Sequence, residues 1–485
     1  MVETQRAKNL ALALLATAQF VVVLDASIVN VALPSIGRDL DFAQGDLSWV
    51  VNAYTLFFGG FLLLGGRLAD LLGRRRIFIY GMWLFAIASL AGGLAQSDIW
   101  LVAARAVQGL GAALISPAAL SILTTTFAEG AERNKALAVW GAVAGSGGAV
   151  GVLAGGMLTE WAGWEWVLFV NTPIGIAAAF LAPRLLDESR DESAPSWDIA
   201  GAVTVTAGLA LLVYTLVDAN DAGWGSAQTL GLGALSIALL VAFVIIELRR
   251  RYPLIPFSIF RLRTLRGSNV IGLLLGMSLF SMFFFISLYM QQVLGYDPLK
   301  AGLAYLPLAG LIIVSAGGAS QLVARFGFKP VLIAGLLFTA AGLFWFSRVS
   351  PDGTYVGDVL FPSMLAAVGL GLSFVPVTIG AVTGTKPSEA GLASGLINTS
   401  QQVGGALGLA VLATVATNRT GDVLASGERN PAVALTEGFQ DAFFAAGVMA
   451  IVAAVLAAVL ISTRDSREMA ELARSGEESP AAIPA

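Results

Sequence analysis

The chain is dominated by long apolar runs that carry almost no charge. Only 12% of its 485 residues are Asp, Glu, Lys or Arg, and 57% are hydrophobic. A soluble domain carries about 25% charged residues. So few charges cannot cover the water-facing surfaces of the roughly three soluble domains that this length would otherwise suggest. Because about 20 apolar residues suffice for a helix to cross a bilayer, the sequence predicts an all-α integral membrane protein.

Fourteen segments are long and apolar enough to be membrane-spanning helices. Their approximate ranges are 10–33, 47–66, 77–96, 99–123, 135–157, 166–183, 199–217, 229–247, 269–293, 302–323, 331–347, 357–380, 393–416 and 441–461. The first follows Arg6 and Lys8 as a signal peptide would, but its apolar run extends to about Leu33. That length favours an uncleaved first helix.

The placement of the basic residues predicts an orientation. With the N-terminus in the cytoplasm, 22 of the 28 Lys and Arg residues fall in inside segments and 5 in outside loops. Cytoplasmic loops are rich in Lys and Arg, so this split supports the number of spans and places both termini in the cytoplasm. No basic arm or block suggests binding to nucleic acid.

The spans group into two bundles. We expect helices 1–6, in residues 1–185, and helices 9–14, in residues 267–463, to form one six-helix bundle each. Residues 186–266 are predicted to be a linker that holds helices 7 and 8, and residues 464–485 a disordered cytoplasmic tail. The basic segment 248–266 is predicted to lie on the headgroups of the cytoplasmic leaflet. An ordinary positive-inside loop is the alternative, and the two interpretations are compatible. Paired repeats with a site at their interface are typical of secondary transporters.

The chain contains neither cysteine nor histidine. This excludes disulfides, thiolate nucleophiles, histidine zinc sites and histidine-based acid–base catalysis. An integral membrane enzyme would need catalytic polar groups clustered at one depth, which the spans do not offer. We therefore expect no enzymatic activity, no metal and no cofactor.

Asp25 and Arg105 are the charged residues that lie well inside predicted spans, away from the span ends. A carboxylate at the centre of a membrane helix costs about 2.5–3.5 kcal/mol on insertion scales, so such a residue is interpreted first as functional. At 1.5 Å per residue, Asp25 lies roughly 12 Å and Arg105 roughly 9 Å from the outer ends of their helices. Opposite charges at similar depth can pair and take part in proton coupling. The alternative is a static structural ion pair.

An acidic residue and three arginines mark the predicted inner end of the second helix. Asp70 is followed by Arg74, Arg75 and Arg76. One interpretation is a gate, in which Asp70 caps a helix or pairs across the bundle interface and the arginines bind helix ends when the inner mouth is closed. The alternative is a topology signal alone, because three arginines in any inner loop satisfy the positive-inside rule.

The fifth helix is punctuated by glycine. Gly147, Gly151 and Gly155 recur every four residues, and Gly156 follows. Small residues at this spacing form a flat stripe that allows another helix to pack closely. Generic packing between membrane helices is the alternative interpretation.

Polar and aromatic residues inside later spans are candidates for the wall of a substrate cavity. The amides of Asn398 and Gln401 in helix 13 indicate either such a wall or hydrogen bonds between helices. Helix 9 carries Phe284 and Tyr289, followed by Gln292. These indicate either an aromatic wall that binds flat or cationic lipophiles or bulk that faces lipid.

Four sequence motifs occur in order along the first half. They are LDASIVNVALP at 24–34, GRLADLLGRRRIF at 66–78, RAVQGLGAA at 105–113 and GVLAGG at 151–156. Together they resemble the motifs of the major facilitator superfamily and, within it, of the fourteen-helix drug:proton antiporter family. The chain departs from that pattern at Leu71, where arginine is usual, at Val152, where proline is usual, and at Ala324, where aspartate is usual.

The resemblance implies a major facilitator fold of two six-helix bundles plus two inserted helices, and roles for the matching residues. Proton coupling falls to Asp25 and Arg105, and substrate-cavity positions to Asn30 and Gln108. The implied gating residues are Gly66, Asp70, Gly73, Arg74 and Arg75, and the implied antiporter-motif packing residues are Gly147, Gly151, Gly155 and Gly156.

The same resemblance implies a function. It is the export of lipophilic drugs or antibiotics across the cytoplasmic membrane by alternating access, in exchange for protons. Because one clear acid lies within a span, we expect neutral or monocationic substrates. The alternative is a dedicated exporter or importer of a single metabolite, such as a self-made antibiotic. We expect a bacterial, multi-pass, monomeric protein whose partners are small lipophilic substrates, protons and membrane lipids.

Overall fold

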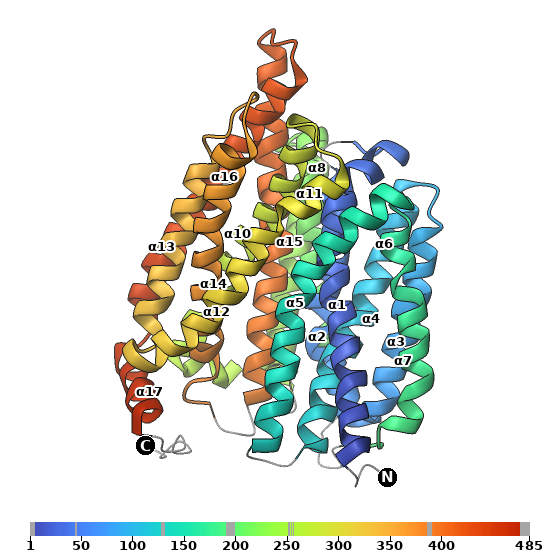
Figure 1. Cartoon of the computed structure of the whole chain (residues 1–485), viewed down its shortest axis with the longest axis vertical. Coiled ribbons are helices and arrows are strands. Elements are labelled where there is room, and N and C mark those ends of the chain that lie inside the picture. Colours follow the sequence, from blue (N-terminus) through green and yellow to red (C-terminus); the bar gives the residue numbers. More distant parts are fainter. Residues whose placement is uncertain are drawn as a thin grey trace. The chain divides into compact units, whose positions relative to one another are not determined.

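The computed structural model describes residues 5–43, 46–127, 131–190, 199–250, 253, 255, 257–385 and 390–475. Every regular element in these residues is a helix or a helical turn (Figure 1). They divide into two compact units, which we describe separately. The first comprises residues 1–215, 224–254 and 297–303, and the second comprises residues 216–223, 255–296 and 304–485.

The first unit contains the helices up to α9. Their bounds are α1 (Gln5–Asp39), η1 (Asp46–Ser48), α2 (Trp49–Leu72), α3 (Arg74–Gly93), α4 (Asp98–Thr126), α5 (Ala131–Trp161), α6 (Trp166–Phe169), α7 (Asn171–Leu185), α8 (Ile199–Ala222, to residue 215 in this unit) and α9 (Ala227–Arg249). Polar residues set the starts of several of them. The Ser97 side chain accepts a hydrogen bond from the Trp100 amide at the start of α4, and Ser226 does the same for Thr229 in α9.

The second unit contains the remaining helices. Their bounds are η2 (Phe257–Arg261), α10 (Arg263–Leu288), η3 (Tyr289–Val293), α11 (Pro298–Ala304, whose residues 298–303 belong to the first unit), α12 (Leu306–Phe326), α13 (Phe328–Phe346), η4 (Tyr355–Leu360), α14 (Phe361–Val382), α15 (Ala390–Ala425), α16 (Pro431–Leu460) and α17 (Thr463–Ser475).

Membrane crossing follows from length and composition. Among the described residues, 11 helical stretches are long and apolar enough to span a bilayer. Each coincides with one of the predicted spans. The three other predicted spans, 135–157, 199–217 and 393–416, fall on α5, α8 and α15, which are 31, 24 and 36 residues long.

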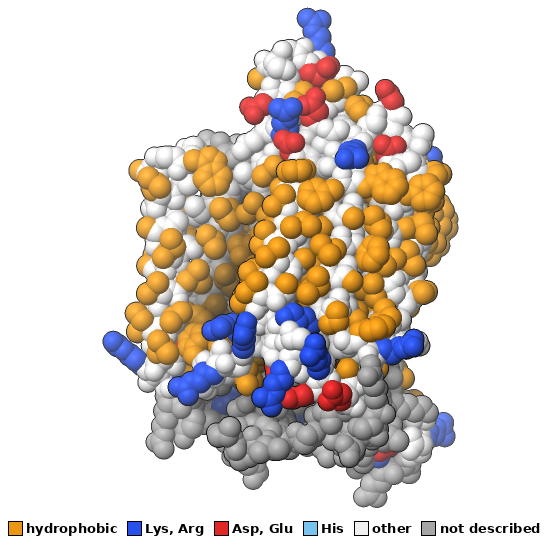
Figure 2. All heavy atoms as spheres, turned by 90° about the vertical axis from the view of Figure 1, so that its left-hand side faces the viewer, with side chains coloured by type: hydrophobic (Ala, Val, Ile, Leu, Met, Phe, Trp, Pro, Cys, Tyr) orange, Lys and Arg blue, Asp and Glu red, His pale blue; other side chains and the backbone are white. Residues whose placement is uncertain are grey.

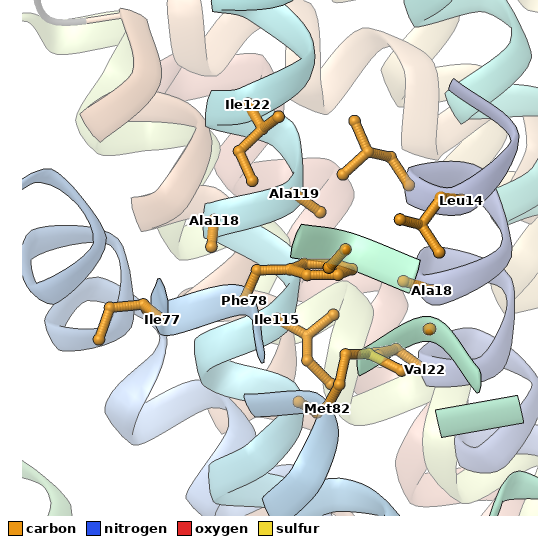
Figure 3. Packing of buried hydrophobic residues seen from close by; sticks show 14 of the residues in the cluster. Leu14, Ala18, Val22, Ile77, Phe78, Met82, Ile115, Ala118, Ala119 and Ile122 are labelled. Carbon is orange, nitrogen blue, oxygen red and sulfur yellow. The ribbon is translucent and has the colours of Figure 1, made fainter. Parts of the chain in front are cut away.

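A hydrophobic core fixes three helices of the first unit beside one another. Leu14, Ala18 and Val22 of α1 pack with Phe78 of α3 and with α4 (Figure 3). The α4 side chains in this cluster are Ile115, Ala118, Ala119 and Ile122. Since Val22 lies three residues before Asp25, this core also holds the part of α1 that carries the buried carboxylate.

The outer surface of the second unit is strongly apolar. On the face drawn in Figure 2, hydrophobic side chains form a broad band, and Lys and Arg side chains gather along one edge of it. On α13 and α16, Leu337, Phe338, Trp345, Phe444 and Val455 are all more than 40% exposed. So large an apolar surface suits contact with lipid and is rare on soluble monomers.

The prediction of a disordered tail from residue 464 is wrong as far as residue 475. Residues Thr463–Ser475 form helix α17, and residues 476–485 lie outside the described residues. Asp465 explains the order, because its carboxylate accepts hydrogen bonds from Thr264 at 2.5 Å and Ser462 at 2.8 Å. The tail is polar, but it is held by specific hydrogen bonds that composition does not reveal. The boundaries predicted between bundles and linker stay predictions.

Candidate functional site

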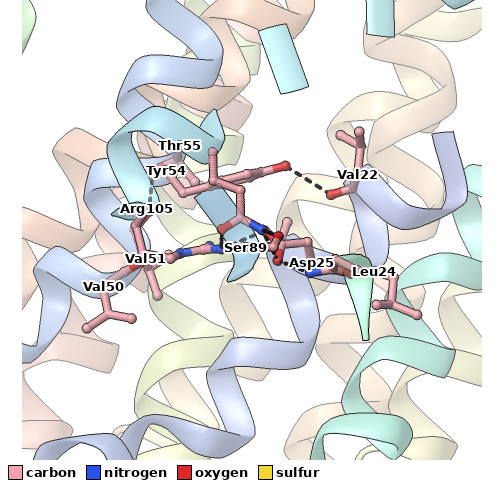
Figure 4. A network of polar contacts seen from close by, with 12 residues as sticks. Val22, Leu24, Asp25, Val50, Val51, Tyr54, Thr55, Ser89 and Arg105 are labelled. Atoms are coloured by element: carbon pink, nitrogen blue, oxygen red, sulfur yellow. Dashed lines mark hydrogen bonds and ion pairs between the residues drawn. The ribbon is translucent and has the colours of Figure 1, made fainter. Parts of the chain in front are cut away.

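The structure brings Asp25 and Arg105 into direct contact inside the first unit. The distance from Arg105 Nη1 to Asp25 Oδ2 is 2.6 Å, and the two side chains are 1% and 0% exposed (Figure 4). Asp25 lies near the middle of α1 and Arg105 in the first third of α4. The sequence predicts that the two residues lie at similar depths in the membrane, and in the structure they are in contact.

Two amide side chains complete the surroundings of the carboxylate. Gln108 Nε2 and Asn171 Nδ2 each donate to Asp25 Oδ1 at 2.7 Å. Gln108 Nε2 also donates to Ser89 Oγ at 2.6 Å, which adds α3 to the network. The carboxylate thus accepts three hydrogen bonds, from α4 and α7. A charge that is both paired and hydrogen-bonded can be kept in a dry interior.

The arginine is held on all sides as well. Arg105 Nε donates to the Val50 carbonyl at 3.0 Å, and Nη1 donates to Gln108 Oε1 at 2.7 Å. The guanidinium carbon lies 4.4 Å from the centre of the Tyr54 ring, which is a cation–π distance. The Tyr54 hydroxyl in turn donates to the Val22 carbonyl of α1 at 3.1 Å. Residues of five helices, α1, α2, α3, α4 and α7, thus meet at one ion pair.

The turn between α2 and α3 forms a second polar cluster. Arg74 Nη2, at the start of α3, lies 2.9 Å from Asp70 Oδ1, four residues earlier and near the end of α2. Arg75 Nη1 donates to the carbonyl of Leu186, the residue that caps the C-terminal end of α7. Asp70 is thus paired locally within its own unit. A partner for Asp70 across the bundle interface stays a prediction.

Glycine makes this turn possible. Gly73 ends α2 at φ 110°, and a Cβ there would lie 2.6 Å from Glu188 Oε1. Glu188 accepts a hydrogen bond from the Arg75 amide at 3.1 Å, and its carboxylate lies 3.7 Å from Arg75 Nε. A carboxylate therefore lies at the N-terminal end of α3, where the helix dipole favours negative charge. Gly66 is in the preceding turns of α2, where its Cβ position lies 3.4 Å from Pro117.

The second unit repeats this arrangement with other residues. Gly327, at φ 83°, separates α12 from α13, and a Cβ there would lie 2.4 Å from the Ser466 carbonyl. The Lys329 amide donates to Ser466 Oγ, and Lys329 Nζ donates to the carbonyl of Ile461, the residue that caps α16. The segment after α7 therefore packs on the turn between α2 and α3, and the segment after α16 packs on the turn between α12 and α13.

The glycine stripe of α5 packs against α1 next to the buried carboxylate. A Cβ on Gly147 would meet Val23, one on Gly151 would meet the Leu24 carbonyl at 2.8 Å, and one on Gly155 would meet the Ile28 carbonyl at 2.4 Å. The Cβ position of Gly156 faces Pro298 at 2.6 Å instead. Close approach of the α1 backbone therefore depends on the missing side chains.

The predicted cavity residues are spread over several environments. Asn30 is buried and donates to carbonyls of its own helix, while Asn398 is exposed. Phe284 and Tyr289 are 2% and 1% exposed, and the Tyr289 hydroxyl donates to the Ser350 carbonyl at 2.7 Å.

Of the other three cavity candidates, Gln108 belongs to the network around the ion pair, and Gln292 and Gln401 lie on helices of the second unit. Gln401 packs its backbone against Gly276, and Gln292 lies in η3. Their role in binding substrate stays a prediction.

Sequence reasoning missed three residues around the ion pair and one at the turn. They are Tyr54, Ser89, Asn171 and Glu188. Each of the first three is a single uncharged residue in an apolar span, so no local pattern marks it. Glu188 lies in an acidic stretch that is typical of an ordinary loop. Its position three residues after the end of α7 is the one signal in the sequence that could have indicated its role.

Comparison with known proteins identifies the family. The profile of the Major Facilitator Superfamily matches residues 15–409. The chain is 44% identical to the cephamycin export protein CmcT of Amycolatopsis lactamdurans over 93% of this chain and 92% of that protein. It is 41% identical to the puromycin resistance protein of Streptomyces alboniger over 97% and 94%. It is 37% identical to the tetracenomycin C resistance and export protein of Streptomyces glaucescens over 83% and 74%.

Solved structures agree on the fold. The chain matches the crystal structure of PepTSo, a POT family transporter, with a TM-score of 0.68 and 15% identity over 96% of this chain and 99% of that one. It matches a bacterial homologue of the human lysosomal transporter Spinster with a TM-score of 0.67 and 18% identity over 99% and 100%. At these identities the likeness concerns the fold alone. The all-helical architecture, the match over most of the length and the relatives together show that the chain belongs to the Major Facilitator Superfamily, a family of transporters.

Proposed function

We propose that this protein exports lipophilic neutral or monocationic drugs or antibiotics across the bacterial cytoplasmic membrane in exchange for protons. The observation that carries the proposal is the fully buried Asp25–Arg105 ion pair, which lies in an otherwise apolar span and is surrounded by hydrogen-bond donors. Intramembrane carboxylates are typical of proton pathways in pumps and transporters. The relatives that are named for antibiotic export and resistance support the choice of substrate class.

The ion pair suggests how proton and substrate movements are coupled. A proton that arrives from outside neutralises Asp25, removes its attraction to Arg105 and favours the inward-facing state. Release of that proton to the cytoplasm restores the pair and reverses the change. One proton that crosses 100 mV supplies about 2.3 kcal/mol, which is enough for modest accumulation of a substrate per cycle. No cofactor is required in this scheme, and with no histidine in the chain the relay runs through carboxylate and water.

The proposal includes the arrangement in the membrane. We assign spans to α5, α8 and α15 in addition to the 11 apolar stretches, which makes fourteen helices with both termini in the cytoplasm. In this assignment the basic edge of the apolar band faces the cytoplasm, in accord with the positive-inside rule (Figure 2). We expect the transporting unit to be a monomer surrounded by lipid.

Transport into inverted membrane vesicles tests the proposal. A panel of lipophilic dyes and antibiotics is offered with and without a pH gradient, to the wild type and to Asp25→Asn. We expect gradient-dependent accumulation of several compounds by the wild type and its loss in the variant. Equal gradient-dependent transport by both proteins would remove Asp25 from the mechanism.

The same panel tests a second candidate, a dedicated exporter of one compound. Three relatives carry names that refer to a single antibiotic each, cephamycin, puromycin and tetracenomycin C. Accumulation of one member of the panel and of no chemically unrelated member would favour this candidate over a broad multidrug exporter.

A further inference from the structure

The buried carboxylate is surrounded by donors only. Asp25 Oδ2 accepts from Arg105, and Oδ1 accepts from Gln108 and from Asn171. An ionised carboxylate only accepts hydrogen bonds, so this arrangement suits the charged form. A protonated carboxyl has an O–H that must donate, and a buried donor without an acceptor is strongly disfavoured. Proton uptake at Asp25, which is part of the proposed function, therefore requires one neighbour to present an acceptor.

Gln108 is not free to do so. Its Nε2 donates to both Asp25 and Ser89, and its Oε1 accepts from Arg105. Reversal of this amide would break three hydrogen bonds and would turn its NH2 group toward the guanidinium, which cannot accept.

Asn171 is free to reverse. Its side chain is 0% exposed, its Nδ2 donates to Asp25, and within the described residues its Oδ1 has no hydrogen-bond partner. A 180° rotation about χ2 would break one hydrogen bond only. The χ2 torsion of asparagine is broad and nearly two-fold, so the reversed amide needs no strained rotamer. The buried, unpartnered oxygen is the acceptor that the neutral carboxyl lacks.

We propose that Asn171 is a positioning residue for the proton: its amide donates to ionised Asp25 and, after reversal, accepts the O–H of protonated Asp25. This inference rests on the proposed proton coupling and adds a residue to it. The titratable groups that face Asp25 are Arg105 on α4 and Tyr54 on α2. The residues that α3 and α7 add to the network, Ser89 and Asn171, are uncharged.

The other helices packed on α1 contribute no charge at this level. Helix α6 has the sequence WVLF, and the described acidic residues of α5, Glu132 and Glu160, lie near its two ends. Glu132 is paired with Lys8 at the start of α1, at 2.9 Å. Among the described residues no other acid lies beside Asn171, so its reversal depends on the protonation state of Asp25 alone.

The position of Asn171 gives the reversal a structural consequence. It is the first residue of α7, directly after the short helix α6 and Val170. When Asp25 gains a proton, its salt bridge to Arg105 loses its charge while its hydrogen bond to α7 is kept in the opposite sense. The carboxyl group of α1 thus loses the ionic part of its contact with α4, while its hydrogen bonds with Gln108 of α4 and Asn171 of α7 remain.

Infrared difference spectra of the full-length protein in lipid nanodiscs, recorded between high and low pH, test the proposal. The asparagine side-chain carbonyls are labelled with 13C. In the wild type, a carboxylic acid band from Asp25 and a shift of one labelled amide band to lower frequency should rise together, because the amide oxygen gains a hydrogen bond. Both should be absent in Asp25→Asn. This comparison requires no substitution at Asn171.

Two further variants assign the amide. In Asn171→Leu the amide shift should vanish and the Asp25 acid band should move from its wild-type frequency, and Asn171→Ser, which can donate or accept, should restore that frequency. Asn269→Leu, which removes a buried amide in the second unit, should leave both signals unchanged. An acid band that rises without an amide shift, or that is unmoved in Asn171→Leu, overturns the inference.

Vesicle transport by the same variants separates this inference from the proposed function. Proton-driven transport that survives in Asp25→Asn contradicts the function assigned to the ion pair. Loss of transport in Asp25→Asn, together with an unmoved labelled amide, contradicts only the role of Asn171.

Discussion

At the scale of single residues, the buried ion pair is stable only as a pair. Each charge is almost completely removed from water, and the geometry of Arg105 is set by Val50, Gln108 and Tyr54 as well as by Asp25. In such sites the loss of one partner leaves the other charge buried and unpaired, which is far more harmful than the loss of both.

A double-mutant cycle should show this coupling. We expect Arg105→Met to lower the free energy of unfolding by about 3–5 kcal/mol, because it leaves the Asp25 carboxylate without its counter-charge. Asp25→Asn with Arg105→Met should be more stable than Arg105→Met alone. Thermal unfolding of purified protein, followed by tryptophan fluorescence, measures the four corners. A double variant that loses the sum of the two single effects would mean that the charges are not coupled.

The polar network also shows how far residue-level prediction reaches. Intramembrane charge identified Asp25 and Arg105, because a charge in an apolar span has a high free-energy cost and stands out in the sequence. Neutral Ser89 and Asn171 do not stand out, since their cost is small once a partner is found. Their importance arises from contacts 19 and 146 residues away along the chain, which no local pattern encodes.

At the scale of elements, the contact between α1 and α5 depends on missing side chains. The α5 glycines that face α1 allow its backbone to approach within van der Waals distance at Leu24 and Ile28, which flank the carboxylate. The sequence spacing predicts a stripe for close packing, and in the structure Gly147, Gly151 and Gly155 face α1, but the spacing alone could not name this partner helix. A stripe of small residues fits any helix that has a complementary surface.

A pair of glycine variants on α5 should separate packing from helix propensity. Gly151→Ala places a Cβ 2.8 Å from the Leu24 carbonyl, whereas Gly148→Ala places one where no atom lies within 4 Å. We expect Gly151→Ala to reduce transport and thermal stability because α1 must shift. Gly148→Ala should be neutral or slightly stabilising, since alanine favours helix over glycine by about 1 kcal/mol. Equal behaviour of the two variants in the transport and melting assays would refute this account.

The turns at Gly73 and Gly327 allow a matched pair of substitutions, one in each unit. Glu188→Ala removes the acceptor of the Arg75 amide in the first unit, and Ser466→Ala removes the acceptor of the Lys329 amide in the second. We expect each change to speed amide hydrogen exchange several-fold at the start of its own helix, α3 or α13, and to leave the other helix at the wild-type rate. Mass spectrometry of peptides that cover 74–78 and 328–332 measures both. Unchanged exchange in the substituted unit would show that the docked segment does not protect the turn.

At the scale of the whole molecule, the sequence predicted most of the fold. The match to the Major Facilitator Superfamily confirms the family, and 11 of the predicted spans reappear as apolar helices of the described residues. Apolar length and charge placement are properties of each segment alone, so they can be read without a structure. The order of the C-terminal helix could not be read in this way, because it depends on Thr264 and Lys329, more than 130 residues away.

The predicted orientation can be tested with single cysteines, since the natural chain has none. Gly225→Cys and Ser426→Cys lie at exposed positions that the fourteen-helix assignment places outside, and Thr125→Cys at one that it places inside. A membrane-impermeant maleimide added to intact cells should label the first two and not the third. Labelling of Thr125→Cys, or protection of Gly225→Cys in cells that express it, would contradict the assigned topology.

The residues of the buried network are far apart in the sequence, and this separation has a consequence for biosynthesis. Asp25 meets Arg105 across 80 residues of sequence and Asn171 across 146. At about 5–20 residues per second, the ribosome makes Arg105 roughly 4–16 seconds after Asp25. During that interval Asp25 has no Arg105 to pair with, and the mean hydropathy of 2.1 in the most apolar window of the first helix favours its insertion despite the carboxylate. The complete site can therefore form only after α4 and α7 have both been synthesised.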